Sequence, residues 1–600
     1  MTYAITQTCC SDAACVAVCP VNCIHPTPQE RAFGSTEMLH IDPRACIDCG
    51  ACADACPVDA IFPVDSLRPG LRPYAEMNAA WFEGAPEQEA PEQGTPEQGA
   101  PEQGAPEPGT RDGGGRGPGA APREEGGAPS AAPAADPAPN FHLWGRPEFT
   151  RVLPADFAPL RIAVVGTGPA GMYAAQDLLL HTNAEITLID RLPVAGGLLR
   201  HGVAPDHPAT RRAGEAFARF HSHPRVRMYL GVQVGRDLSA QELAAHHDAV
   251  VYAVGASSDR PLGLPGEESP RVLPAARLVA WYNAHPDVAP DAVDLSGVRR
   301  VAVVGSGNVA LDTARILVCD PASLAATDIA DHALAALRDA DVREVVVLGR
   351  RGPEDAACTR GELLALTHLP GVDLVVDDHD PRIGAAIATA RPGGRAAVLR
   401  GLPRGSVAPG PPPSGRRRIV LRFHSAPTDL RPVGTQGGIL VTGGTGAAGG
   451  RGPHALPADL VVRAVGYRGE PVEGLPFDAE RGTVPHEGGR VAGMPGTYVV
   501  GWIKRGPTGG IGANRACAAE TVGTLLTDAV GGMLPSPRGT VRAFDRLVRR
   551  RAGRVVDARG LRLIDRAERA RGRADGRPRS RLATVEELVA AARGPWRPGR

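Results

Sequence analysis

The chain has 600 residues, 12 cysteines and a formal net charge of zero at pH 7. This length allows several domains, and no run of eighteen apolar residues predicts a membrane span. No basic stretch is interleaved with aromatic residues, so binding to nucleic acid is not expected. The N-terminus has no basic region followed by an apolar core, so no signal peptide is expected.

The cysteines gather at the N-terminus, where nine of the twelve fall within the first 56 residues. The run Cys46-x-x-Cys49-x-x-Cys52-x-x-x-Cys56-Pro57 brings four thiols together before a proline. This spacing is typical of a cubane iron–sulfur cluster, in which three close thiolates hold one cluster and the fourth reaches a second. Zinc is the alternative, but it prefers two separated Cys-x-x-Cys pairs. Thiols kept free for iron predict a cytoplasmic location.

An upstream group of cysteines repeats the end of this run, because Cys15-x-x-x-Cys19-Pro has the same form as the segment at 52–57. The duplication resembles a two-cluster bacterial ferredoxin, a small α+β domain. The resemblance implies that the fourth cysteine of each half binds the other half's cluster. One four-iron cluster would then be held by Cys19, Cys46, Cys49 and Cys52, and the other cluster by Cys56, Cys15 and an upstream thiol, Cys9.

The first half of the duplication departs from the family pattern, since it lacks a Cys-x-x-Cys-x-x-Cys triplet and offers only Cys9 and Cys10 before Cys15. It resembles the seven-iron ferredoxins, which carry a three-iron cluster on three cysteines and one four-iron cluster. Cys23 and one of the adjacent pair would then bind no iron. The sequence leaves open whether the first cluster is [3Fe-4S] or [4Fe-4S].

Low-complexity sequence follows the predicted ferredoxin domain of residues 1–65. Five tandem pentads cover residues 85–109, and Gly/Ala/Pro-rich sequence continues to about residue 140. Because this stretch has little apolar surface to bury, we expect residues 66–158 to form a disordered linker. A flexible tether of this length would hold the two ends at an effective concentration on the order of millimolar.

A dinucleotide-binding unit is predicted from residue 161. An apolar strand at 161–165 leads directly into the glycine-rich turn Gly166-x-Gly168-x-Ala170-Gly171, and a helix is expected over 172–180. The glycines allow the backbone to approach a pyrophosphate, whose charge lies at the helix N-terminus. The next strand, 185–189, ends at Asp190, and an acidic residue there accepts the ribose hydroxyls.

A second unit of the same form starts at residue 300. Its turn is formed by Gly305-Ser306-Gly307-Asn308-Val309 and a helix is expected through about residue 317. The following strand, 344–348, runs into Arg350 and Arg351 in place of an acidic residue. Two guanidinium groups at this position suit a ribose 2′-phosphate, so the second unit is predicted to bind NADPH.

Two such units in one chain predict a flavin–nicotinamide pair, with FAD on the unit that has the acidic strand end. Similar strand-plus-glycine segments at 250–256 and 461–467 flank the second unit. They are expected to be the crossings where an NADPH-binding domain, 263–459, is inserted into an FAD-binding domain formed by 159–262 and 460–600. The predicted fold class is therefore α/β, with two Rossmann-like domains preceded by the small ferredoxin domain.

Four segments make a family resemblance specific. They are Gly-Val-Ala-Pro-Asp-His-Pro at 202–208, Gly-Asn-Val-Ala-Leu-Asp at 307–312, Gly-Arg-Arg-Gly-Pro at 349–353 and Gly-Trp-Ile-Lys-Arg-Gly-Pro-Thr-Gly at 501–509. From about residue 160 the chain resembles ferredoxin–NADP reductases of the adrenodoxin-reductase type. With its N-terminal cysteines, the whole chain resembles the fused ferredoxin/ferredoxin–NADP reductases of actinobacteria.

The resemblance implies roles for individual residues. FAD would contact Ala170, Asp190, Leu198, Val234, Trp502, Gly509, Gly510 and Ile511. The NADPH pyrophosphate would lie on residues 306–309, and its adenosine phosphate end between Arg350, Arg351 and Glu362.

The roles of His207 and Lys504 are less closely defined by the motifs. His207 would lie near the nicotinamide and orient it, although a plain turn histidine is an equal alternative. Relatives can pair this histidine with a glutamate whose position is Ala365 here, so the pair is not expected. Lys504, the only lysine, is expected near the flavin or a docked partner, with chance retention as the alternative.

The predicted activity follows from the cofactors. NADPH delivers a hydride to FAD, and iron–sulfur clusters of the fused domain or of a separate ferredoxin then accept electrons singly. The alternatives are a subunit like the small subunit of glutamate synthase, serving a larger partner, and a docking module with an inactive flavin half. No Cys-x-x-x-x-Cys occurs in the flavin half, which argues against a disulfide reductase.

Overall fold

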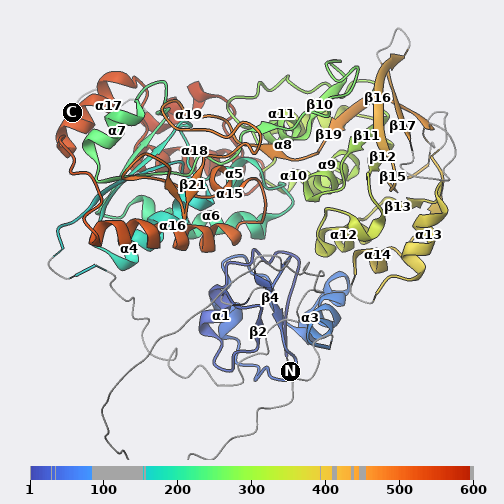
Figure 1. The fold of residues 1–600 in the computed structure, drawn as a ribbon. Helices are drawn as coiled ribbons and strands as arrows, with labels where there is room; N and C mark the ends of the chain where they lie inside the picture. Colours follow the sequence, from blue (N-terminus) through green and yellow to red (C-terminus); the bar gives the residue numbers. More distant parts are fainter. Residues whose placement is uncertain are drawn as a thin grey trace, which may run out of the picture.

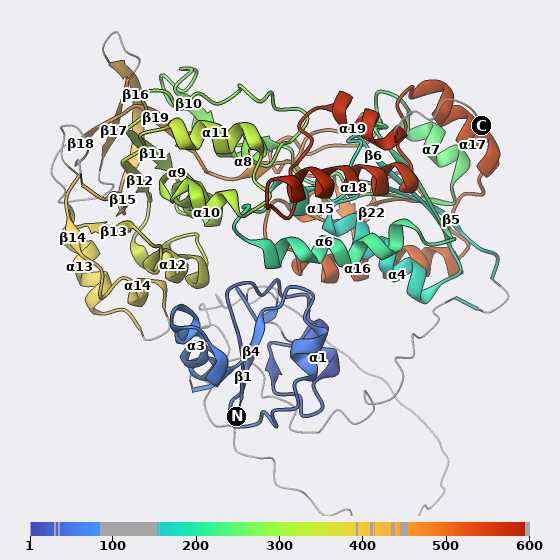
Figure 2. The ribbon, with the colours of Figure 1, turned by 180° about the vertical axis from the view of Figure 1, so that it is seen from behind.

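The computed structural model describes residues 2–83, except 29, 31, 34 and 35, and residues 153–594, except 155, 156, 392, 393, 408–411, 413, 414, 434–437 and 445–453. The pentads and most of the predicted linker therefore lie outside the described residues. Figure 1 and Figure 2 show two α/β lobes side by side, with the N-terminal module against the side where they meet. No helix of the described segments is long and apolar enough to cross a bilayer.

The N-terminal module consists of two short antiparallel ribbons and three helices. The strand β1 (Tyr3–Ile5) pairs with β4 (Ile61–Pro63), and β2 (Ile24–His25) pairs with β3 (His40–Ile41). The helices α1 (Ala14–Val18) and α2 (Ala51–Ala55) are equivalent in the duplication, because each follows a left-handed residue and ends at a cysteine in extended conformation. The predicted repeat is therefore visible in the backbone.

The prediction that the linker begins at residue 66 is wrong. Two 3₁₀ turns, Val64–Ser66 and Pro69–Leu71, lead into α3 (Pro73–Glu83). The buried Asn78 side chain accepts hydrogen bonds from the backbone N–H groups of Ile5 (3.1 Å) and Ile41 (2.8 Å). Because these bonds tie α3 to both ribbons, the ordered module extends to residue 83.

The first sheet has seven strands in the order β21-β22-β23-β8-β5-β6-β7 and is parallel except at β21 and β22, which pair antiparallel at one edge. The central strand β5 (Arg161–Val165) is flanked by β8 (Ala249–Tyr252) and β6 (Glu185–Asp190) and leads into α4 (Pro169–His181). The remaining strands are β7 (Val226–Leu230), β21 (His486–Glu487), β22 (Arg490–Val491) and β23 (Thr497–Val499). The helices of this lobe are α5 (Leu198–His201), α6 (Pro208–His221), α7 (Ala240–His246), α15 (Trp502–Arg505), α16 (Ala513–Val530), α17 (Val541–Arg551), α18 (Ala558–Ala574) and α19 (Val585–Arg593).

The second parallel sheet also has seven strands, in the order β10-β19-β11-β12-β15-β13-β14. These are β10 (Val272–Pro274), β19 (Leu460–Arg463), β11 (Arg300–Val304), β12 (Glu344–Leu348), β15 (Arg417–Arg422), β13 (Val372–Asp377) and β14 (Arg404–Gly405). Its helices are α8 (Ala275–Tyr282), α9 (Asn308–Val318), α10 (Pro321–Ala325), α11 (Asp331–Asp339), α12 (Arg360–Thr367), α13 (Pro381–Ala388) and α14 (Arg395–Val398). A small antiparallel sheet of β16 (Ala426–Val433), β17 (Gly438–Gly444) and β18 (His454–Ala458) covers its outer end.

Two crossings connect the lobes, and one of them differs from the prediction. The strand β8 belongs to the first sheet as expected, but β19 pairs in parallel with β10 and β11 inside the second sheet. The return to the first lobe therefore follows residue 463 and does not begin at residue 460. The crossings meet where β9 (Ser258–Asp259) pairs with β20 (Tyr467–Arg468). The predicted α/β fold with two Rossmann-like sheets is confirmed.

Candidate functional site

The nine N-terminal cysteines form two groups in space. We call Cys9, Cys10, Cys15 and Cys56 the first thiol group and Cys19, Cys23, Cys46, Cys49 and Cys52 the second. Burial raises the pKa of the Cys15 thiol, and the neighbouring Cys9 and Cys56 act in the same direction. The structure thus brings each predicted ligand set together, including the exchange of the fourth cysteine between the two halves.

The thiol groups of the described residues contain no set of three sulfurs close enough together to surround a single zinc ion. Four thiolates at 2.3 Å from zinc would lie about 3.8 Å apart. In the described residues, no three cysteine sulfurs lie within 4.8 Å of one another. Cys23 is a fifth thiol of the second group, with its Sγ 3.4 Å from that of Cys19.

A cleft of about 2200 Å³ lies between the two parallel sheets. It exceeds the ~300–1,000 Å³ of an ordinary small-molecule site, so it has room for two dinucleotides. Gly171 is the one predicted binding residue outside it. The other predicted residues line it: Gly166, Gly168, Ala170, Asp190, Leu198, His207, Val234, Ser306, Gly307, Asn308, Val309, Arg350, Arg351, Glu362, Trp502, Gly509, Gly510 and Ile511.

The first glycine-rich turn lies at the carboxyl end of β5, and two of its glycines are required by space. A Cβ on Gly166 would lie 2.3 Å from the carbonyl oxygen of Ala253, and one on Gly171 would lie 2.1 Å from that of Gly166. Gly171 therefore serves helix–strand packing. The Asp190 carboxylate accepts hydrogen bonds from the Thr167 N–H (2.8 Å) and hydroxyl (2.6 Å), which fixes the turn. The other Asp190 oxygen accepts from the Leu192 N–H (3.0 Å), which leaves it one further lone pair for a ribose hydroxyl.

The second turn follows β11 at the start of α9. The Asn308 side chain accepts a hydrogen bond from the Thr359 N–H (2.7 Å), so the turn is held by the segment that leads into α12. Arg350 and Arg351 follow β12, and both side chains are exposed and line the cleft. Their position beside the turn suits recognition of a phosphate attached to a ribose.

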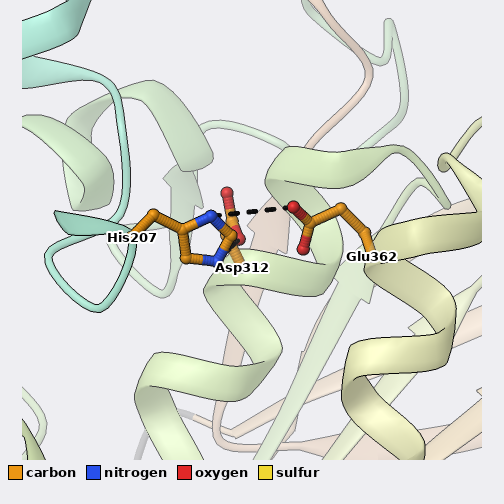
Figure 3. Close-up of side chains that lie close together, drawn as sticks. All are labelled: His207, Asp312 and Glu362. Atoms are coloured by element: carbon orange, nitrogen blue, oxygen red, sulfur yellow. Dashed lines mark ion pairs between the residues drawn. The ribbon is translucent and has the colours of Figure 1, made fainter. Parts of the chain in front are cut away.

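An ionic network joins the two lobes around His207, at the N-terminus of α6 (Figure 3). The His207 Nδ1 lies 3.7 Å from a Glu362 carboxylate oxygen, and its Nε2 lies 3.9 Å from Asp312. The buried Arg315 guanidinium donates to His207 Nε2 (2.6 Å), Asp312 (2.6 Å) and Asp206 (2.7 Å). The three residues of Figure 3 could hold a cation by their spacing, but Arg315 already supplies the positive charge.

Arg315 also influences which nitrogen of His207 carries the proton. A guanidinium has no acceptor, so this contact favours Nε2 as the acceptor, with the Nδ1–H facing Glu362. Burial and the Asp312 carboxylate raise the pKa of Glu362, against the opposing effects of His207 and Arg315. Burial alone would raise the pKa of Asp206, but the adjacent Arg315 guanidinium lowers it below its usual value.

The network corrects one expectation from the sequence. Because Ala365 stands where relatives can carry the partner glutamate, a His–Glu pair was not expected, and Glu362 was assigned to the adenosine phosphate end. The structure places a Glu362 carboxylate oxygen 3.7 Å from His207 Nδ1, and its contact with the adenosine phosphate end stays a prediction. Sequence reasoning missed Arg315, whose only local signal is its position three residues after Asp312 on α9.

Lys504 is buried at the edge of the cleft. Its ammonium donates to a Glu520 carboxylate oxygen (2.7 Å) and to the Thr521 hydroxyl (2.9 Å) on α16. These bonds anchor the short helix α15, which carries Trp502, onto α16. A contact with a flavin remains a prediction.

Two family models match the chain. One described as "Pyridine nucleotide-disulphide oxidoreductase" matches residues 160–348, and one described as "4Fe-4S binding domain" matches residues 39–62. A Mycobacterium tuberculosis protein named "Probable ferredoxin/ferredoxin--NADP reductase" is 43% identical over 605 residues, covering 99% of this chain and 95% of the relative. The Arabidopsis thaliana "NADPH:adrenodoxin oxidoreductase, mitochondrial" is 38% identical and covers 73% of this chain.

A solved structure agrees with these matches. The structure titled "Mycobacterium tuberculosis FprA in complex with NADPH" superimposes with a TM-score of 0.66 at 41% identity. It covers 73% of this chain and 100% of its own length.

Proposed function

The chain belongs to the ferredoxin/ferredoxin–NADP reductase family, and on this premise we propose that it oxidises NADPH through FAD and passes the electrons singly to iron–sulfur clusters. The first acceptor is its own N-terminal module, and a separate ferredoxin or another one-electron acceptor protein follows. The observation that carries this proposal is the common cleft, which is lined by both glycine-rich turns and by Cys9 and Cys10. A subunit of the glutamate synthase type is not favoured, because the chain spans 95% of a relative named as a reductase.

The domain assignment follows the sheets. We propose a ferredoxin domain over residues 1–83, an FAD-binding domain over 157–262 and 464–594, and an NADPH-binding domain over 263–463. FAD would lie along the first turn, with Asp190 at its ribose and Trp502 along the flavin. NADPH would lie on the second turn, with Arg350 and Arg351 at its 2′-phosphate.

The cluster assignment follows the two thiol groups. The second group would hold a [4Fe-4S] cluster through Cys19, Cys46, Cys49 and Cys52. The first group would hold a [3Fe-4S] or [4Fe-4S] cluster through Cys9, Cys15 and Cys56, with Cys10 as the further candidate ligand. A protein that keeps these thiols reduced would work in the cytoplasm.

The residues of the chain position the reaction and leave the redox chemistry to the cofactors. When bound, FAD accepts a hydride from NADPH and returns electrons one at a time. His207 is held between Arg315 and Glu362 and presents an oriented imidazole at the cleft. Overall, NADPH loses two electrons and one proton, and each of two clusters takes one electron.

The experiment is anaerobic reconstitution of the full chain, with measurement of flavin, iron and acid-labile sulfide, followed by NADPH-dependent reduction of ferricyanide and cytochrome c. We expect all three components and reduction of both acceptors. A protein that binds flavin and reduces neither acceptor would be a docking module. EPR of the oxidised and reduced protein separates a three-iron from a four-iron first cluster.

A further inference from the structure

The N-terminal module lies against both lobes of the reductase (Figure 1, Figure 2), and its residues Cys9, Cys10, Ser11 and Glu37 line part of the cleft. On the FAD-binding side, the Gly512 N–H at the start of α16 donates to the carbonyl oxygen of Cys10 at 2.6 Å. A Cβ on Gly512 would lie 2.1 Å from the backbone of Ser11, so only glycine permits this approach. The Arg515 guanidinium lies 3.9 Å from the Asp12 carboxylate.

The contact on the NADPH-binding side is made at the start of α12. The Glu37 carboxylate accepts a hydrogen bond from the Arg360 N–H (2.7 Å) and forms an ion pair with Arg395. The buried Tyr74 hydroxyl of α3 donates to the carbonyl oxygen of Gly361 at 3.1 Å. The module therefore binds the helix that carries Glu362, the partner of His207.

The charges at this interface are complementary. Asp12, Glu37 and Asp59 of the module meet Arg515, Arg395 and Arg212 of the reductase. Each pair is partly exposed, so salt weakens it. Such an interface can orient the tethered module on the reductase and still allow the module to dissociate.

The two thiol groups face different environments. Cys9, Cys10 and Ser11 line the cleft together with Gly509, Gly510 and Ile511, the residues assigned to the flavin. The second thiol group lines a separate small cavity formed only by residues of the module, and Cys49 is exposed there beside Ile47, which is 54% exposed. Electron transfer slows steeply with distance, so the group at the cleft is the favoured entry point.

We propose that the N-terminal module works docked in this position, and that electrons pass from the flavin to the cluster of the first thiol group, then to the cluster of the second, and leave at the surface around Ile47 and Cys49. This order rests on the proposed function, because it arranges the same carriers. One NADPH supplies two electrons in two successive single transfers and releases one proton and NADP⁺. The external acceptor is a one-electron carrier protein that binds this exposed face.

The sharpest test is Gly512→Ala in the full holoprotein. Gly512 has φ −66° and ψ −31°, so alanine fits the local backbone and only the docked module opposes it. We expect the rate of flavin reduction by NADPH to change less than twofold. Cluster reduction should slow about tenfold, because the variant loses a hydrogen bond that holds the module in its docked position. Gly523→Ala on the same helix, where a Cβ meets open space, is the matched control and should change neither rate.

A second pair of variants tests docking without relying on electron transfer. Glu37→Lys should raise amide hydrogen exchange at Gly512, a site that Glu37 does not touch, by about tenfold because the docked state opens as a unit. The charge exchange Glu37→Lys with Arg395→Glu should restore part of the protection, because it re-forms the ion pair but not the hydrogen bond from the Arg360 N–H. Fast exchange at Gly512 in the unmodified protein, or no response to Glu37→Lys, would overturn the docked arrangement.

The order of the clusters is tested with Cys15→Ser and Cys49→Ser, each checked by iron content and EPR for loss of one cluster and retention of the other. Cys15→Ser should keep flavin reduction and prevent reduction of the second cluster. Cys49→Ser should allow reduction of the first cluster while cytochrome c reduction falls. Reduction of the second cluster at the unmodified rate in Cys15→Ser would overturn the order, whereas absence of flavin reduction in the unmodified protein would refute the proposed function itself.

Discussion

The two large sheets carry the same strand–turn–helix unit, and two of the differences between the units bear on their cofactors. The first unit has Gly171 at the third small position and its next strand ends at Asp190, whereas the second has Ala310 and its next strand, which ends at Leu348, is followed by Arg350 and Arg351. At Gly171 a Cβ would overlap a carbonyl oxygen, but the Ala310 methyl is accommodated and fully buried. The two units thus share one fold and differ in how closely the helix packs on the turn and in the charge that follows the second strand.

The largest expected effect concerns the packing difference. Gly171→Ala should destabilise the FAD-binding lobe by about 3 kcal/mol, because the methyl group meets fixed backbone. The reciprocal change, Ala310→Gly, should cost only about 1 kcal/mol through helix propensity. Urea unfolding followed by flavin fluorescence measures the first change, and urea unfolding followed by circular dichroism measures the second. Retention of flavin at the unmodified urea midpoint in Gly171→Ala would contradict the proposed difference.

The charge at the strand end gives the next largest effect. The preference for NADPH over NADH is the ratio of the two kcat/KM values. Replacing Arg350 and Arg351 together by serine should lower this ratio about 100-fold, because two charge-assisted hydrogen bonds of about 1.5 kcal/mol each are lost. Arg227→Ser, on the first sheet, is the control. Ferricyanide reduction with each nucleotide is the assay, and an unchanged ratio would exclude these residues from 2′-phosphate recognition.

The carboxylate of the first unit should control the other cofactor. Asp190→Asn should weaken FAD binding about tenfold, because it removes one charge-assisted acceptor from Thr167 and the ribose. The preference for NADPH over NADH should stay unchanged. Titration of the apoprotein with FAD gives the dissociation constant. If Asp190→Asn changed the nucleotide preference and left FAD binding unaltered, the first sheet would bind the nicotinamide nucleotide and the second would bind FAD.

The smallest effect is a pH dependence at the network between the sheets. The pKa of Glu362 is raised above its ordinary value of 4.5, so this carboxylate takes up a proton as pH falls through that raised value. Loss of its negative charge opposite His207 should slow flavin reduction a few-fold at acid pH. Glu362→Gln keeps an oxygen acceptor and should remove this pH dependence. Stopped-flow measurement of the flavin reduction rate across pH tests this prediction. If the rate of the variant falls at acid pH as it does in the unmodified protein, a group other than Glu362 causes the pH dependence.

Features that depend on local sequence were predictable. The strands, the two turns and the division of the cysteines into two groups follow from short motifs. The structure places the thiols of each group together and the predicted cofactor-binding residues along one cleft, as expected. Features that depend on packing between distant segments were not. Asn78 joins α3 to the module through hydrogen bonds to β1 and β3, which are distant in sequence. The strand β19 is assigned to the second sheet because it pairs with β10 and β11. Arg315 reaches His207 because the two lobes meet.

The central claim is that electrons from NADPH enter through a flavin and reach the N-terminal clusters within one chain. The most direct measurement is anaerobic rapid mixing of the reconstituted holoprotein with NADPH, followed by absorbance and freeze-quench EPR. The account predicts that the flavin absorbance falls first and that reduced clusters then appear at a rate independent of protein concentration. Clusters that stay oxidised while the flavin is fully reduced, or that are reduced only in proportion to protein concentration, would contradict it.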